Sequence, residues 1–185
     1  MSLVTTLLFL LRDDGRQVLL AMKKRGFGQG KWNGPGGKVE RGETVRAAAV
    51  RECREETNVD VHPDRLFAAG RLLFTFPDRD EWKDQTCFVF VAAGVDAATA
   101  AAATETDEMR PAWHDIDAIP LDAMWQDDRL WLPALLERPG EATVNLECVF
   151  DAQGDLVSHR KLDPLPDLDA IVDRVDFAHP TASSG

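Results

Sequence analysis

The 185-residue sequence is poor in cysteine and contains no tyrosine. Its three cysteines, Cys53, Cys87 and Cys148, are widely spaced and form no Cys-x-x-Cys pair. Neither a disulfide framework nor a zinc site is therefore indicated. Free cysteines fit a reducing compartment, so we expect a cytoplasmic protein.

Basic residues are also scarce, with 21 Lys and Arg against 32 Asp and Glu and a net charge of −11. Binding to nucleic acid polymers or to anionic membranes requires a basic surface, so we expect neither as a partner. Small anions remain possible ligands, because residues 15–39 contain no acidic residue and six basic ones, namely Arg16, Lys23, Lys24, Arg25, Lys31 and Lys38.

Long hydrophobic runs are absent as well. The N-terminal apolar run, residues 3–11, is too short to cross a bilayer and lacks the basic start of a signal peptide. We expect a core strand there. With 44% hydrophobic residues, the chain can bury one continuous core, which predicts one compact domain.

Alternating segments predict a mixed β-sheet with helices on both faces, an α/β fold. Residues 4–11 and 17–22 are β-type runs that flank an Asp-Gly turn, which indicates a hairpin. Further β-type runs lie at 66–76, 86–93 and 110–116, a second hairpin at 144–150 and 155–162, and helix-type segments at 44–57 and 129–137.

Two segments carry little pattern. Residues 95–106 are rich in Ala and Thr and predict a surface loop. Residues 163–185 contain three prolines, several aspartates and a small-residue end, so we expect an acidic C-terminal tail that is at least partly disordered. The catalytic domain would then span residues 1–162.

The segment 37–59 is the most informative part of the sequence. On a helix, Glu55 and Glu56 lie roughly 60° and 40° to either side of Glu52, so three carboxylates crowd one arc. Their repulsion calls for a cation, and carboxylates without His or Cys suit Mg²⁺ or Mn²⁺, which also binds phosphates. Considered alone, such a cluster is more often a solvated helix face.

The surrounding residues weigh against that alternative. Gly37, Glu43 and Arg51, together with Glu52, Glu55 and Glu56, resemble the Nudix hydrolase signature at every charged position. Cys53 replaces a larger aliphatic residue of the signature, and Asn58 replaces a glycine after the helix, where Asn is the best substitute. The resemblance implies an α/β Nudix fold and a divalent metal cofactor, Mg²⁺ or Mn²⁺.

Segments outside the signature resemble the MutT-type oxidised purine nucleoside triphosphate hydrolases. They are residues 22–28, 31–34, 107–111 and 124–128, within a similarity that runs from about residue 6 to residue 136. The resemblance implies hydrolysis of oxidised purine nucleotides, such as 8-oxo-dGTP or 2-hydroxy-dATP, to monophosphate and pyrophosphate. Such an enzyme sanitises the nucleotide pool, and we expect a monomer.

The resemblance also implies roles for individual residues. Glu52, Glu55, Glu56 and Glu108, with the backbone carbonyl of Gly36 or Gly37, would hold the metal. Glu52 or Glu56 would be the general base for the attacking water. Arg51, held by Glu43, would orient the residues of the signature. Lys23 would contact the phosphates, although a solvated lysine is the alternative reading.

Base recognition would rest on Asn33, Asp127 and Asp128. Trp125 would stack on the purine, with Phe27, Phe74 and Met109 lining the pocket. Adjacent carboxylates in an apolar pocket push one pKa upward, so one of them could donate to a purine carbonyl. The alternative is that the two aspartates simply cap the following helix. Near residues 84–85 the family often has an apolar residue, so Gln85 could alter base preference.

Two alternative functions remain. One is a Nudix pyrophosphatase of another or broader nucleotide specificity. The other is a catalytically idle domain that binds a nucleotide. Such domains usually lose a glutamate or the arginine of the signature, and all of these are present here.

Overall fold

The computed structural model describes residues 2–26, 28–78 and 82–175. Its core is a mixed sheet with the strand order β3-β2-β1-β5-β4-β7-β8, and β6 pairs with β2. The strands are β1 (Leu3–Arg12), β2 (Gln17–Lys23), β3 (Trp32–Asn33), β4 (Phe67–Thr75), β5 (Gln85–Val95), β6 (Met109–Asp115), β7 (Val144–Phe150) and β8 (Leu156–Lys161). The α-helices are α1 (Val45–Thr57), α2 (Ala97–Ala100), α3 (Asp128–Glu137) and α4 (Leu168–Val172), and three single 3-10 turns lie at Pro63–Arg65, Ile116–Ala118 and Leu121–Ala123.

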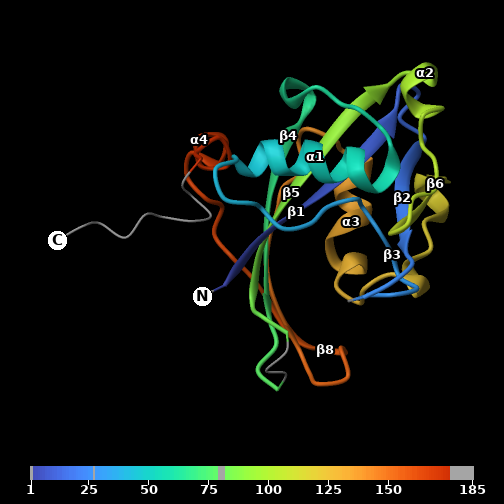
Figure 1. Cartoon of the computed structure of the whole chain (residues 1–185). Coiled ribbons are helices and arrows are strands. Elements are labelled where there is room, and N and C mark those ends of the chain that lie inside the picture. Colours follow the sequence, from blue (N-terminus) through green and yellow to red (C-terminus); the bar gives the residue numbers. More distant parts are fainter. Residues whose placement is uncertain (1, 27, 79–81, 176–185) are drawn as a thin grey trace.

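Both predicted hairpins are confirmed. β1 pairs with β2, and β7 with β8, in antiparallel fashion. Two parallel pairings join distant parts of the chain, since β1 lies along β5 and β4 lies along β7. These pairings bring the start of the chain to the middle of the sheet (Figure 1).

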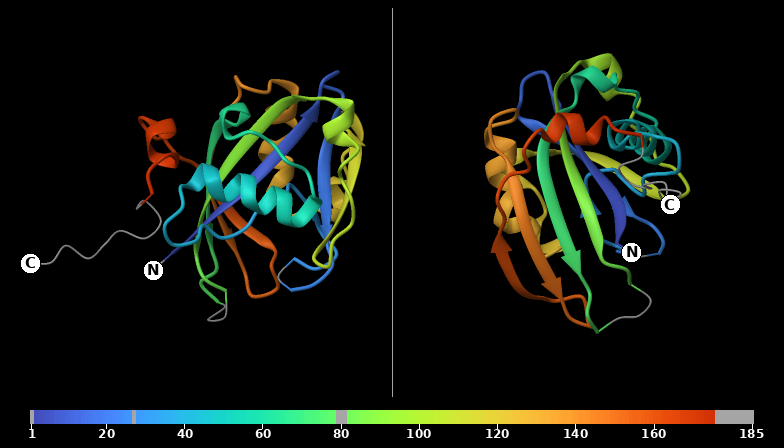
Figure 2. Two further views of the ribbon diagram at one scale, coloured as in Figure 1. Left: turned by 45° about the horizontal axis from the view of Figure 1, so that its top comes forward. Right: turned by 90° about the vertical axis from the view of Figure 1, so that its left-hand side faces the viewer.

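Alternate residues of β1 enter two separate cores, one on each face of the sheet. Phe9 and Leu11 pack in the cluster that contains Trp131 and Leu135 of α3. Leu8 and Leu10 pack in the cluster that contains Ala48, Ala49 and Cys53 of α1. Figure 2 shows α1 and α3 on opposite sides of the sheet, which confirms the predicted helices on both faces.

The ends of α1 follow from its flanking residues. The hydroxyl of Thr44 accepts a hydrogen bond from the N–H of Ala47, which is an N-cap. Asn58 ends the helix in the left-handed conformation with φ 61°, and its N–H donates to the carbonyl of Arg54. Asn tolerates this conformation better than other non-glycine residues, so the departure from glycine is accommodated.

Residues 95–106, expected to be a surface loop, include the short helix α2, and Ala100 is buried. That prediction was wrong because a short Ala-rich helix gains its stability from tertiary packing. Residues 163–175 include α4, whose Val172 is fully buried. The C-terminal tail, residues 163–185, was expected to be at least partly disordered. Its last part, residues 176–185, lies outside the described residues. In the described part of the chain, no helix has both the length and the apolarity that a membrane crossing needs.

Candidate functional site

The glycine loop before α1, residues 34–38, lies so close to the sheet and to the helix that side chains on Gly36 and Gly37 would not fit. A Cβ on Gly36 would come within 2.0 Å of the Thr6 carbonyl oxygen, and one on Gly37 within 2.6 Å of both Glu52 carboxylate oxygens. The N–H of Gly36 donates to Glu56 at 2.9 Å. The loop thus delivers bare backbone to the carboxylates of α1.

Arg51 is the centre of an ion-pair network on α1. Its guanidinium donates to Glu43 at 2.7 and 3.1 Å, to Glu52 at 2.9 Å and to Glu55 at 3.1 Å. It also donates to the Lys38 carbonyl, in the glycine loop, at 3.0 Å. These hydrogen bonds, above all those to Glu43, raise the pKa of Arg51 despite its partial burial. Arg51 therefore links Glu43, the loop and the helix carboxylates.

Glu56 is the most buried carboxylate of the cluster, with 4% of its side chain exposed. Burial raises its pKa to about 6, although the Gly36 N–H and Lys23 favour the charged form. The ammonium nitrogen of Lys23 lies 3.3 Å from the Glu56 carboxylate. Burial likewise raises the pKa of Glu52, against the effect of Arg51. Both groups are thus closer to neutral pH than exposed glutamates, as a general base requires.

The four predicted carboxylate ligands line one acidic cavity. It is formed by Glu52, Glu55, Glu56 and Glu108, with Arg25, Asn58, Glu105, Thr106 and Asp107. Each of the four has a basic partner, namely Arg51 for Glu52 and Glu55, Lys23 for Glu56 and Arg25 for Glu108. No three His, Cys, Asp or Glu side chains among the described residues are gathered tightly enough to enclose a metal ion. The donor set nevertheless fits a hard divalent cation, because all four side-chain donors are carboxylates.

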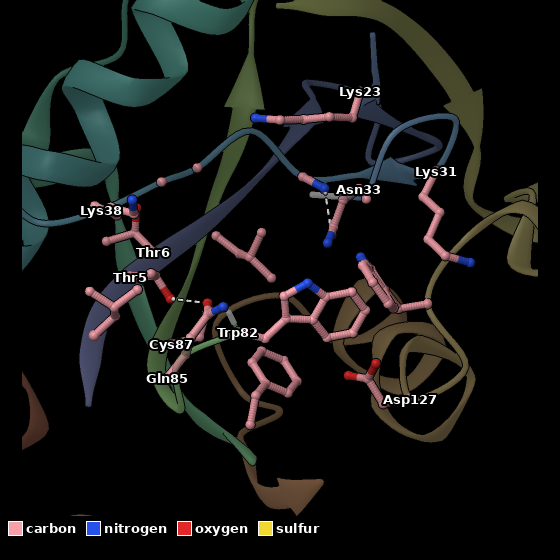
Figure 3. A pocket seen from close by; sticks show the side chains of 18 of the residues that line it. Thr5, Thr6, Lys23, Lys31, Asn33, Lys38, Trp82, Gln85, Cys87 and Asp127 are labelled. Atoms are coloured by element: carbon pink, nitrogen blue, oxygen red, sulfur yellow. Dashed lines mark hydrogen bonds between the residues drawn. The ribbon is translucent and has the colours of Figure 1, made fainter. Parts of the chain in front are cut away.

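A second cavity, of about 510 Å³, adjoins this acidic one through Lys23. Figure 3 shows Lys23 and Asn33 on the upper side of it and Asp127 on the lower side. The structure brings together here every predicted base and phosphate contact that lies in the described residues: Lys23, Asn33, Phe74, Met109, Trp125, Asp127 and Asp128. Phe27 lies outside the described residues.

Asp127 and Asp128 are almost fully buried in the wall of this cavity, with 1% and 2% exposure. Asp127 accepts from the indole N–H of Trp131 at 3.2 Å, and Asp128 accepts from the backbone N–H of Trp125 at 3.1 Å. Burial raises the pKa of both, and their mutual repulsion raises that of Asp128 further. Asp127 stands at the N-cap position of α3 but forms no side-chain cap hydrogen bond there, and the Asp128 carboxylate bonds Trp125, which precedes the helix.

Several cavity residues were not predicted. They include Thr5, Thr6 and Leu7 of β1, Trp82 and Lys83 before β5, and Lys31, Phe76 and Phe150. Lys31 lies over the Trp125 ring at 5.0 Å from its centroid. The pair Thr5-Thr6 inside an otherwise apolar strand was a usable signal, since two hydroxyls are costly in a core strand unless they find partners. Gln85 also lines the cavity and accepts from the Thr5 hydroxyl at 3.3 Å (Figure 3).

Comparisons with known proteins define the family. Residues 1–135 match the NUDIX domain model, and the chain therefore belongs to the Nudix family. It is 44% identical over 162 residues to the oxidized purine nucleoside triphosphate hydrolase of Danio rerio, covering 87% of this chain and 95% of that protein. It is 42% identical over 137 residues to the protein of the same name from Mus musculus, covering 74% and 81%.

The solved structures agree on the fold. A MutT protein from Bacillus halodurans superposes with a TM-score of 0.59 at 24% identity, covering 89% of this chain and 99% of that chain. A MutT protein from Methanosarcina mazei gives the same TM-score at 21% identity, covering 76% and 96%. These likenesses confirm the α/β Nudix fold predicted from the sequence.

Proposed function

We propose that this protein hydrolyses oxidised purine (deoxy)nucleoside triphosphates to monophosphate and pyrophosphate with Mg²⁺, or Mn²⁺, as cofactor. The observation that carries the proposal is the placement of an acidic cavity beside a nucleotide-sized cavity that has two buried aspartates in its wall. The names of the two relatives above 40% identity support the same substrate class.

The acidic cavity would hold the metal, as Nudix hydrolases generally use divalent metal ions. Glu52, Glu55, Glu56 and Glu108 would supply carboxylate ligands. Of the two candidate backbone ligands, the Gly37 carbonyl already accepts from the Thr6 N–H at 2.9 Å, which favours that of Gly36. When bound, the cation neutralises charge on the phosphate oxygens.

Glu56 or Glu52 would take the proton of the attacking water. Arg51 and Glu43 would hold Glu52 in place, since Arg51 bonds both carboxylates. Lys23 lines the nucleotide cavity and lies 3.3 Å from Glu56, so its ammonium group can pass from that carboxylate to a substrate phosphate.

The purine would lie between Trp125 and the residues of the opposite wall, with Asn33 and the aspartate pair at its edge. Because two buried neighbouring carboxyls resist ionising together, one would stay protonated at neutral pH and donate to a base carbonyl. An oxidised purine carries the extra oxygen that such a donor recognises. Phe27, Phe74 and Met109 would complete the pocket wall.

The catalytic domain would comprise residues 1–162. The enzyme would act in the cytoplasm as a monomer that sanitises the pool of free nucleotides. The excess of acidic residues supports free nucleotides over polymers, because polyanions require a broad basic surface.

The reaction is tested with Glu56→Gln. We expect the rate of 8-oxo-dGTP hydrolysis, measured by chromatography of the monophosphate, to fall by about 10³-fold or more. General-base catalysis contributes about 10²–10⁴-fold, and a metal ligand is lost with it. Nucleotide binding should persist. Glu105→Gln is the matched control, because Glu105 lines the same acidic cavity but pairs with Lys24. Unchanged turnover in Glu56→Gln would contradict the assignment of the site.

A further inference from the structure

The segment Trp125-Gln126-Asp127-Asp128 contributes three of its four side chains to the nucleotide cavity. Trp125, Asp127 and Asp128 line the cavity, whereas Gln126 does not. The segment forms a tight turn, in which the N–H of Asp128 donates to the Trp125 carbonyl and the N–H of Trp125 donates back to the Asp128 carboxylate, both at 3.1 Å. Displacing Gln126 would therefore move all three cavity residues together.

Gln126 is held at both ends of its carboxamide by the turn between β7 and β8. Its NH₂ group donates to Asp155 at 2.6 Å, and its carbonyl oxygen accepts from the backbone N–H of Leu156 at 2.8 Å. Both partners lie about thirty residues further along the chain. Because both ends are bonded, these two hydrogen bonds favour one orientation of the side chain, and they tie the backbone at residue 126 to the hairpin.

The turn that provides these partners is itself well ordered by hydrogen bonds. The carboxylate of Asp151 accepts from the N–H groups of Gln153 and Asp155 at 2.9 and 3.0 Å. Gly154, with φ 87°, presents its backbone to two rings, since a Cβ there would lie 3.4 Å from Trp82 and 3.7 Å from Trp125. A rigid turn can act as a fixed support for the cavity wall.

The same hairpin also contacts the stacking residue directly. The ring of Phe150, the last residue of β7, packs edge-on against Trp125 with centroids 5.9 Å apart. The hairpin thus contacts Trp125 through Phe150 and comes close to it at Gly154. It bonds the following residue, Gln126, through Asp155 and Leu156.

We propose that Gln126 is a positioning residue for base recognition, which ties the segment 125–128 to the β7–β8 hairpin and so fixes Trp125 and the aspartate pair against the purine. The inference rests on the proposed function, because it concerns the affinity for the base. Gln126 lines neither the nucleotide cavity nor the acidic cavity. Its loss is expected to weaken substrate binding without changing the chemical step.

The test measures KM and kcat with 8-oxo-dGTP for Gln126→Ala, Asp155→Ala and the double variant. We expect KM to rise about fivefold or more, as the loss of one or two hydrogen bonds implies, with kcat within about twofold. The double variant should be no worse than Gln126→Ala, since both changes remove the same contact. Asp155→Asn should restore KM relative to Asp155→Ala, because its side-chain carbonyl still accepts the bond.

Gln153→Ala is the matched control, since Gln153 is an exposed glutamine of the same turn and its side chain makes none of these contacts. Hydrogen exchange of residues 124–130 provides a readout that needs no substrate. It should accelerate in Gln126→Ala and stay at the wild-type rate in Gln153→Ala. Unchanged exchange, or a KM equal to that of wild type, would overturn the positioning role. A wild-type enzyme inactive on oxidised purines would instead contradict the proposed function, while the exchange result would still decide the role of Gln126.

Discussion

Asp127 and Asp128 are the residues on which the account of base recognition depends. Both are nearly inaccessible, and their partners are an indole N–H and a backbone N–H rather than a basic side chain. Burial raises the pKa of both in the folded state. Folding therefore becomes less favourable as pH rises from the unfolded value of about 4 through the raised folded values.

Asp128→Asn should remove this penalty. Relative to wild type, we expect the free energy of unfolding of the variant to increase as pH rises from about 4 to 7. The increase should reach at most about 1.4 kcal/mol for each pH unit that separates the folded pKa of Asp128 from its unfolded pKa. The amide oxygen can still accept from the Trp125 N–H. Urea unfolding at several pH values measures the difference.

Asp122→Asn is the control for that experiment, because Asp122 is fully exposed and lies in the same region of the chain. The profile of Asp128→Asn is compared with that of Asp122→Asn, which makes the same chemical change at an exposed position. A profile of Asp128→Asn that does not differ from this control would mean that the buried aspartate has an ordinary pKa and cannot serve as a donor at neutral pH.

At the scale of elements, the sequence predicted the helices and hairpins that are stabilised by interactions between residues close together in the chain. The ends of α1 follow from Thr44 and Asn58, and the two hairpins from Asp-Gly and Gln-Gly turns. The parallel pairings of β1 with β5 and of β4 with β7 join residues about eighty apart, which no local pattern encodes. The cavity wall formed by β1 and the residues before β5 depends on these pairings, so it too was missed.

The helix α4 was missed for a related reason, since it is short and its support comes from elsewhere. Arg46 on α1 bonds Asp169 at 2.9 Å and Asp173 at 2.7 Å, although only 13% of its side chain is exposed. It also donates to the Leu66 carbonyl and lies over the ring of Phe90. Arg46 therefore joins the C-terminal helix to the start of the signature helix.

Arg46→Ala should destabilise the fold by about 2 kcal/mol, because it leaves a buried carbonyl and two carboxylates without their donor. Thermal and urea unfolding measure the loss. Arg54→Ala is the matched control on the same helix, where the arginine is 70% exposed and pairs with exposed Asp60 at 3.4 Å. That change should cost less than about 1 kcal/mol. Equal losses for the two variants would contradict the role of Arg46.

At the scale of the whole molecule, the net charge of −11 coexists with a cavity whose own lining is basic. Four lysines line the nucleotide cavity, namely Lys23, Lys31, Lys38 and Lys83. Three of them come from the basic stretch 15–39 of the sequence, and Lys83 comes from outside it. Acidic residues elsewhere discourage polymer binding, so the basic cavity can select a small phosphate ester.

The most direct test of this account is a ranked substrate panel, in which kcat/KM is measured at saturating Mg²⁺ for 8-oxo-dGTP, 2-hydroxy-dATP, dGTP, dATP, ADP-ribose and a diadenosine polyphosphate. We predict that at least one oxidised purine triphosphate exceeds its canonical counterpart by about tenfold or more, because a buried hydrogen-bonding pair rejects a base that lacks the matching group. A clear preference for ADP-ribose or the diadenosine polyphosphate would contradict the account.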